Sequence, residues 1–292
     1  MGTVIVQLMH PGGEPGQCSK KTVGSIIPWN TNGHCRKFMV HNGEYVSSRT
    51  QKQPIKDSLI FWGEWEPPSI IKSIYGIKSV PQCLLEPVFS GGMPKGALNT
   101  DPMIFGKRFY FTNCRQNNNK KNNPTLLQQL TSGSLILFGS HSDGAFLLDT
   151  VFVVKEGHKI KKIGDAEKII KQHGNESLYC ANLGPLFSGR CGSSFFSQYT
   201  LYEGVTYDER SEYGGMFSFV PARVGNSSPF NRIPFANSGI LLGCVSPKLK
   251  QNFRRTEFSN IKCVSNIFDL VVKEVVGQNC VLGIRFEDIK CP

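Results

Sequence analysis

The chain has 292 residues and 39% of them are hydrophobic, so it can bury a substantial core and is not a disordered tail. Its 33 Lys and Arg residues exceed its 22 Asp and Glu residues, and the net charge of +11 favours a polyanionic partner, nucleic acid before an anionic membrane surface. Without a long apolar stretch, or a charged start followed by one, we expect no membrane span, no signal peptide and a cytoplasmic protein with reduced thiols.

Short runs of β-branched and aromatic residues between turn signals predict strands along most of the chain. These runs cover residues 4–8, 37–40, 59–65, 108–112, 134–138, 145–154, 216–220, 240–245 and 281–286. Asn42-Gly43 predicts a tight hairpin turn, because this pair accepts positive φ angles, and Ser142-Asp-Gly144 predicts a second hairpin.

Helices are expected at three places only: residues 125–130 after Pro124, 165–173 before Gly174, and 263–276 before Gly277. The pattern therefore predicts a β-rich α+β fold, either a mixed sheet or a partly open barrel with a few flanking helices. A weak shift in composition near residues 155–175 does not amount to a domain boundary, so we expect residues 1–292 to form one integrated domain.

Aromatic residues stand beside Asn, Arg and Gln at several points, a combination that suits a pocket for one nucleobase. Aromatic faces stack on the plane of a base, and the polar groups bind its edge. His10, in a Gly/Pro-rich loop after the first strand, could reach the same ligand. The candidate base-binding residues are His10, Trp62, Trp65, Tyr110, Asn113, Arg115, Gln116, Phe217 and Arg223. The alternative is that these aromatic residues simply pack in a β-rich core.

Three carboxylates are the candidate catalytic groups: Glu64, Asp101 and Asp149. Glu64 and Glu66 are expected on the same side of a strand beside tryptophans, where a carboxylate could stabilise an oxocarbenium-like centre or position water. Asp101 lies among basic residues, which favour its ionised form. Asp149 interrupts an apolar run and must find partners or perform a function. Exposed strand positions for the glutamates and a turn for Asp101 are the alternatives.

Two basic clusters could follow a DNA backbone, although ordinary solvated side chains would look the same in sequence. The residues proposed for this contact are Lys107, Arg108, Lys120, Lys121, Arg254 and Arg255. We find no Cys-x-x-Cys pair, no His-x-x-x-His pair and no phosphate-binding glycine motif, so we expect no metal and no cofactor. Cys35 or Cys114 could join a distant His as a nucleophilic dyad, but inert thiols are the simpler interpretation.

Several motifs together resemble bacterial families associated with modified nucleotides and phage defence, and in particular the anti-phage DNA glycosylases that excise α-glucosylated hydroxymethylcytosine. The motifs lie between residues 10 and 219: His10-Pro-Gly-Gly, Trp62-Gly-Glu-Trp, Thr100-Asp-Pro102, Asn113-Cys-Arg-Gln116, Gly133-Ser-Leu-Ile-Leu-Phe-Gly-Ser140, Leu148-Asp-Thr-Val-Phe-Val and Gly214-Gly-Met-Phe-Ser-Phe219. The resemblance implies binding of modified double-stranded DNA, flipping of one base and cleavage of its N-glycosidic bond, which leaves an abasic site.

Two other classes of protein fit the same sequence features. A non-catalytic reader of modified bases, of the PUA, ASCH or YTH kind, would carry the same aromatic cage and basic rim. A modification-dependent nuclease is less favoured, because the chain lacks a clustered Asp/Glu/Lys motif for magnesium.

Overall fold

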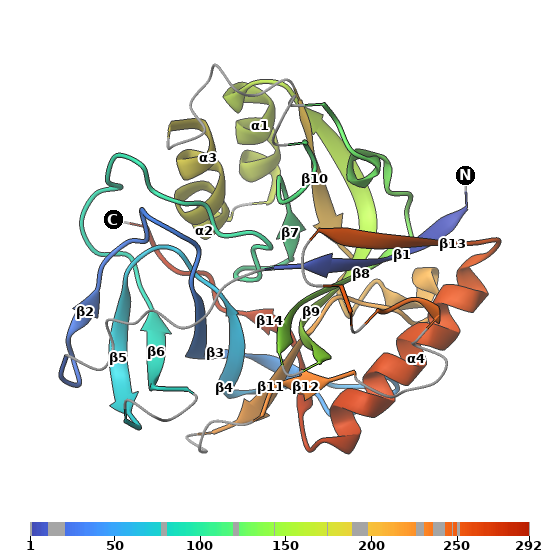
Figure 1. Cartoon of the computed structure of the whole chain (residues 1–292), viewed down its shortest axis with the longest axis horizontal. Helices are drawn as coiled ribbons and strands as arrows, with labels where there is room; N and C mark the ends of the chain where they lie inside the picture. The colour runs from blue at the N-terminus through green and yellow to red at the C-terminus, as the bar shows by residue number, and fades with distance from the viewer. Residues whose placement is uncertain are drawn as a thin grey trace.

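The computed structural model describes residues 2–10, 21–76, 81–118, 123–142, 144–173, 175–188, 198–225, 231–235, 243–246, 248–249 and 252–291. These residues form two mixed β-sheets with a few helices around them (Figure 1). The predicted β-rich α+β fold is therefore confirmed.

The first sheet has the strand order β13-β1-β8-β9-β10-β7, and β12 pairs with β9 as well. Its strands are β13 (Phe253–Phe258), β1 (Thr3–Met9), β8 (Leu135–Ser142), β9 (Ala145–Ile160), β10 (Tyr199–Gly204), β7 (Tyr110–Phe111) and β12 (Ile233–Pro234). β1 is parallel to β8 and antiparallel to β13. Six of its seven residues are buried, as expected for a nearly continuous apolar run in the middle of a sheet.

The second sheet has the strand order β14-β11-β4-β3-β6-β5-β2. Its strands are β14 (Val281–Phe286), β11 (Val220–Val224), β4 (Ile55–Glu64), β3 (Arg36–Val46), β6 (Cys83–Pro87), β5 (Ser69–Ile74) and β2 (Ile26–Ile27). β14 also pairs with β3, so β3, β4, β11 and β14 close into a four-stranded barrel. This closure removes the free edges of these four strands.

Helices gather at two places on the sheets (Figure 1). α1 (Ile163–His173), α2 (Glu176–Leu178), a π-helical turn (Tyr179–Leu183) and α3 (Gly184–Ser188) cover one end of the molecule. α4 (Ile261–Gly277) lies on another side and buries an apolar face that includes Val264, Phe268 and Val271. Its first turn is capped by the side chain of Asn260, which accepts the Cys263 N–H.

The two sheets share their hydrophobic core. One cluster joins Val6, Leu8 and Phe138 of the first sheet to Met39 and Phe61 of the barrel, and all five are at most 1% exposed. Burying a side chain of this size contributes roughly 1.5–3 kcal/mol, so the interface between the sheets carries much of the stability. That the whole chain forms one domain stays a prediction.

The hairpin predicted at Asn42-Gly43 is wrong. β3 runs through these residues, and Gly43 pairs with Asp57 in β4 while also lying beside β14. A Cβ atom on Gly43 would lie 2.5 Å from the Arg285 carbonyl oxygen, so the glycine permits close approach of a strand rather than a turn.

The other local predictions vary in accuracy. β8 and β9 form the hairpin expected around residues 142–144, with Ser142 opposite Ala145 and Asp143 outside the described residues. The predicted helix at 125–130 is a short 3-10 helix, Leu126–Gln129. In the predicted strand 240–245, residues 240–242 lie outside the described residues, and Gly243–Val245 are not in a strand. Within the part of the chain described, none of the helices combines the length and apolar character needed to cross a bilayer.

The prediction that all thiols are reduced is also wrong. Cys180, in the π-helical turn, forms a disulfide with Cys291 near the C-terminal end of the described residues, and Cys83 of β6 is disulfide-bonded as well. Sequence spacing gave no hint of the first bond, because its partners are 111 residues apart.

Candidate active site

A polar cavity lies where the ends of the two sheets meet. His10 directly follows β1 and Asp149 belongs to β9 of the first sheet, whereas Arg36 begins β3 and Glu64 ends β4 of the barrel. The free space is about 10 Å³, enough for roughly one water molecule. Its walls are His10, Arg36, Gly63, Glu64, Pro102, Ile104, Phe138, Asp149 and Thr150.

Asp149 reaches the cavity from a β-bulge. Phe138 pairs with Thr150 and Gly139 pairs with Leu148, so Asp149 is the extra residue of β9 at this register shift. A Cβ atom on Gly139 would lie 2.2 Å from the Leu147 carbonyl oxygen, and the glycine therefore permits the bulge. Bulges redirect side chains next to functional sites, which explains how a carboxylate can interrupt this apolar run.

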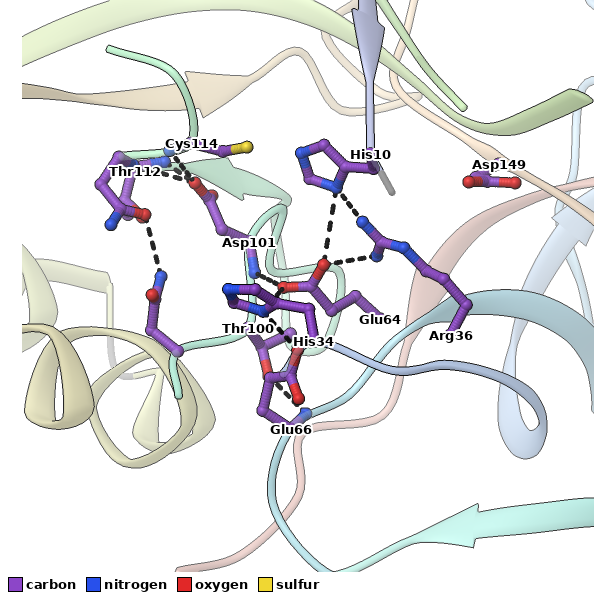
Figure 2. A network of polar contacts seen from close by, with 12 residues as sticks. His10, His34, Arg36, Glu64, Glu66, Thr100, Asp101, Thr112, Cys114 and Asp149 are labelled. Carbon is purple, nitrogen blue, oxygen red and sulfur yellow. Dashed lines mark hydrogen bonds and ion pairs between the residues drawn. The ribbon is translucent and has the colours of Figure 1, made fainter. Parts of the chain in front are cut away.

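Arg36 and Glu64 form a buried ion pair that contacts His10 (Figure 2). Arg36 and Glu64 are directly opposite each other in the β3–β4 ladder, and Arg36 Nη1 lies 2.6 Å from Glu64 Oε2. Arg36 Nη2 contacts Nδ1 of His10, which also lies 3.5 Å from Glu64 Oε2. Burial and the neighbouring Arg36 charge lower the pKa of His10 to about 4, so this imidazole is neutral at physiological pH.

The second oxygen of Glu64 is held by the backbone of another loop. Oε1 accepts the Asp101 N–H at 2.9 Å and lies 3.6 Å from His34 Nδ1. Burial opposes ionisation of Glu64, but the charges of Arg36 and His34 hold its pKa well below the ordinary value. Glu64 is therefore a fixed anion with both oxygens engaged, and it is better suited to hold Arg36 and His10 than to accept a proton.

Glu66 forms a second carboxylate contact just beyond the end of β4. Its Oε1 lies 2.5 Å from His34 Nδ1, and its other oxygen accepts a hydrogen bond from Asn30. The half-exposed His34 thus contacts Glu64 and Glu66 together. Although burial opposes protonation, these two carboxylates raise the pKa of His34 to about 11, so His34 is a cation.

Asp101 lies beside Glu64 but does not line the cavity. Its carboxylate accepts backbone N–H groups from Thr112 at 2.8 Å, Asn113 at 2.9 Å and Cys114 at 2.7 Å. Burial raises its pKa to about 6 against the effect of these hydrogen bonds. Of the three predicted catalytic carboxylates, Glu64 and Asp149 both line the cavity. The Asp101 carboxylate instead binds the backbone of residues 112–114, and the Asp101 N–H bonds Glu64.

Arg232 covers the other side of Asp149. Its guanidinium forms an ion pair with Asp149 Oδ1, donates to Ser140 Oγ at 2.6 Å and lies over the Trp62 ring, 4.6 Å from the ring centroid. Burial raises the pKa of Asp149, although Arg232 opposes this effect. One face of Trp62 is therefore occupied by an arginine from a distant segment.

Several buried polar atoms at this site have no hydrogen-bond partner among the described residues. Buried polar groups in proteins are nearly always paired, and an unpaired one costs about 1–3 kcal/mol. A concentration of such atoms is therefore typical of a place that receives a ligand or water. The atoms are His10 Nε2, Arg36 Nε, Trp62 Nε1, Asp149 Oδ2 and Arg232 Nε.

Most predicted base-binding aromatic residues pack in the core. Trp65 is fully buried against Phe105, with ring centroids 4.9 Å apart, and its Nε1 donates to the Pro68 carbonyl. Tyr110 is 1% exposed, and Phe217 packs against Phe268 on α4. For these three residues the structure agrees with the alternative interpretation that they are core residues.

The polar candidates for base binding are also placed away from the cavity walls. Gln116 is fully buried and its side chain bonds both backbone groups of Thr200. Asn113 accepts a hydrogen bond from Asn99. Arg115, which has a left-handed φ of 59°, and Arg223, which lies on β11, are not among the residues that line the cavity. His10 and Trp62 are thus the predicted base-binding residues that the structure brings to the Asp149 site.

The proposed DNA-backbone residues do not form one row of free cations in the described parts of the chain. Arg108 makes two 2.8 Å contacts with Glu209, Arg255 pairs with Glu257, and Arg254 donates to the Gly243 carbonyl. Lys107 is exposed. Lys120 and Lys121 lie outside the described residues.

Two clusters in the described residues have the composition of metal sites: His34 with Glu64 and Glu66, and His158 with Glu156 and Glu203. In the first, Arg36 and Asn30 already bind the carboxylates, so a cation would compete with them. The absence of a metal cofactor stays a prediction. Burial raises the pKa of the Cys35 and Cys114 thiols, which disfavours the thiolate that a nucleophilic dyad needs.

Sequence reasoning missed Arg36 and Arg232. Arg232 lies 83 residues from Asp149 and carries no local motif. Arg36 does leave a weak signal in the sequence, because the Arg36-Lys37 pair directly precedes the apolar run of a predicted strand. In the structure both residues are buried. Comparisons with protein-family models, curated proteins and solved structures find no match to this chain.

Proposed function

We propose that this protein is a phage-defence DNA glycosylase that flips a glucosylated hydroxymethylcytosine out of double-stranded DNA and hydrolyses its N-glycosidic bond, leaving an abasic site. The observation that carries the proposal is the unpaired Asp149 Oδ2 in a cavity that has room for about one water and also contains a neutral histidine. A carboxylate beside water is the arrangement that N-glycoside hydrolysis needs.

In this mechanism Asp149 activates water and stabilises the developing sugar cation. Glu64 and Arg36 stay ionised and hold the wall of the cavity, because each neutralises the other. The cavity is too small for a nucleobase, so the base must displace Arg232 from the face of Trp62 and stack there. Stacking of about 1–3 kcal/mol would offset a flipping cost of similar size.

The change Asp149→Asn keeps the shape of the side chain but removes its negative charge, so release of free base should fall by about 100- to 10,000-fold. Mass spectrometry would measure base released from duplexes that contain cytosine, hydroxymethylcytosine or either glucosyl anomer. Asp57→Asn, an exposed carboxylate on β4, is the matched control and should keep full activity. Unchanged release by D149N would contradict the mechanism.

The ion pair between Arg232 and Asp149 favours the second candidate, a reader of modified bases. A carboxylate neutralised in this way can hold an arginine without performing chemistry. A reader would bind one modified duplex selectively and release no base from any of them, whereas strand breaks without free base would indicate a nuclease.

We also propose a cytoplasmic location, where incoming phage DNA would be met. The Cys180–Cys291 disulfide is the observation against it, because such bonds persist mainly in oxidising compartments. Fractionation of cells that express the protein should recover it in the cytoplasmic fraction. Recovery in the periplasmic or extracellular fraction would contradict the proposed location.

A further inference from the structure

Several cations in the described part of the chain are already paired with carboxylates. Lys72 Nζ lies 2.9 Å from Glu86 Oε2, and Lys155 Nζ lies 2.8 Å from Glu209 Oε1. A paired cation attracts a polyanion only weakly, because the neighbouring carboxylate offsets its charge. Unpaired cations that lie close together therefore indicate better where a polyanion binds this basic protein.

Four exposed lysines without such partners gather at α1. Two directly precede the helix and two lie within it: Lys161, Lys162, Lys168 and Lys171. Lys168 and Lys171 are about one turn apart, so they share one side of the helix. In the part of the chain that the structure describes, none of the four side chains forms an ion pair or donates a hydrogen bond.

The acidic residues of α1 offset this charge only in part. Asp165 turns back to the start of the helix, where its Oδ2 accepts the backbone N–H groups of Lys161 at 3.0 Å and Lys162 at 3.2 Å. Glu167 is exposed to solvent. Residues 161–171 carry four lysines against these two acids, so the exposed side of the helix keeps an excess of positive charge.

The opposite side of α1 decides which kind of polyanion fits. The helix packs against β9 and the π-helical turn, and it buries Ala166 fully and Ile169 to 8% exposure. A helix that binds an anionic membrane inserts its apolar side into the lipid, whereas here that side faces the protein. The lysines therefore fit a partner that is bound through its charge, as the phosphate backbone of duplex DNA is.

α1 is also connected to the candidate site. It packs against the π-helical turn, at the end of the molecule that carries the helices (Figure 1). In this turn the Ala181 carbonyl accepts the Thr100 N–H at 2.8 Å, and the next residue, Asp101, donates to Glu64 at the cavity. A duplex extends to both sides of a flipped base, so its backbone contacts need not lie at the cavity itself.

We propose that Lys161, Lys162, Lys168 and Lys171, the α1 lysine surface, hold the phosphate backbone of duplex DNA independently of its base sequence. This inference rests on the proposed function, because it assigns the surface that holds the substrate of that site. Contacts to phosphate fix the position of a protein on the duplex and carry no sequence information. Recognition of the modified base is then left to the cavity.

The salt dependence of binding tests this surface, with an unmodified duplex as the probe. Each phosphate that a lysine neutralises contributes about −0.9 to the slope of log affinity against log salt concentration. The variant K161Q/K162Q/K168Q/K171Q should therefore have a slope that is shallower by about 3 to 4 units in fluorescence anisotropy. The control K52Q/K262Q/K273Q/K290Q removes four exposed lysines elsewhere and lowers the net charge equally. Equal slopes for the two variants would overturn the proposal.

A second measurement uses wild-type protein only. Acetylation of lysines, read by mass spectrometry, should decrease at Lys168 and Lys171 when a saturating unmodified duplex is present. Lys52 and Lys273 should be acetylated equally with and without DNA. Equal acetylation of the α1 lysine surface in both conditions would overturn the proposal.

The outcomes separate this surface from the proposed reaction. If wild-type protein releases no base from any duplex but the α1 variant alone loses salt-dependent binding, the glycosylase function fails and the surface stands. If wild-type protein releases modified base while both variants bind duplex alike, the surface fails and the reaction stands. Wild-type protein that ignores DNA at low salt but binds anionic phospholipid vesicles through these lysines would overturn the choice of DNA.

Discussion

Single residues at the site differ in how far the sequence could predict them. Glu64, Asp149 and His10 were selected because carboxylates and histidine beside aromatic or apolar runs are chemically unusual, and the structure places all three on one cavity. Asp101 is a candidate because of its basic surroundings in the sequence, yet three backbone N–H groups occupy its carboxylate. Sequence can identify a polar group that needs partners, but it cannot say whether the partner is the backbone of the protein or a ligand.

The pH dependence of stability should report on His34. Glu64 and Glu66 raise the pKa of His34 to about 11 against an ordinary value of 6.5, so protonation favours the folded state. This contribution is fully present below pH 6.5 and is lost as pH rises toward 11. We therefore expect the free energy of unfolding in urea to fall more between pH 6 and pH 9 in wild-type protein than in His34→Gln. Equal slopes in both proteins would contradict the ion pairs, and His141→Gln is the control.

Among the elements, long strands with clear patterns were predicted well and special backbone positions were not. The strands near residues 4–8, 134–138 and 281–286 can be predicted because strands buried in a core need runs of apolar residues, and these runs are visible in the sequence. The prediction of a turn at Asn42-Gly43 is wrong because a glycine can be required for two reasons, a turn or the close approach of another segment of the chain. At Gly43 the second reason applies. The bulge at Asp149 was invisible because it depends on the register between β8 and β9.

Gly139→Ala tests the bulge. The added Cβ would meet the Leu147 carbonyl oxygen and the Phe146 ring within 2.6 Å, and backbone cannot move aside cheaply. We expect a loss of about 1–3 kcal/mol in the free energy of unfolding, together with reduced base release as Asp149 shifts. Gly164→Ala in α1 has open space around the new atom and should be neutral or slightly stabilising. Equal stability of the two variants in thermal unfolding would exclude the crowding argument.

At the scale of the whole molecule, composition and strand patterns were enough to predict the fold class. They could not predict that two sheets form, or where the sheets contact each other. Closure of the barrel depends on β14 reaching β3, and the site depends on strands from both sheets. The Cys180–Cys291 disulfide likewise joins residues that are far apart in the sequence. It lies near the candidate site, because the carbonyl of Ala181, the residue after Cys180, accepts a hydrogen bond from the N–H of Thr100, the residue before Asp101.

Reducing this disulfide should lower the stability of the whole chain. A crosslink over a long loop typically contributes about 2–4 kcal/mol, mainly by restricting the unfolded state. Cys180→Ser should therefore unfold at lower urea concentration than wild-type protein under non-reducing conditions, and the difference should shrink in reductant. Cys263→Ser, which replaces a free cysteine, is the control. A difference that persists unchanged in reductant would show that the crosslink is not its cause.

The strand order has a consequence for synthesis of the protein. β1, which begins at Thr3, pairs with β13 at Phe253–Phe258, and the barrel closes only when β14 at Val281–Phe286 joins β3. Arg232, which covers Asp149, is likewise made late. A growing chain on the ribosome therefore carries His10, Arg36 and Glu64 long before β13, β14 and Arg232 can complete the site. The proposed base excision would therefore become possible only after translation of the chain is complete.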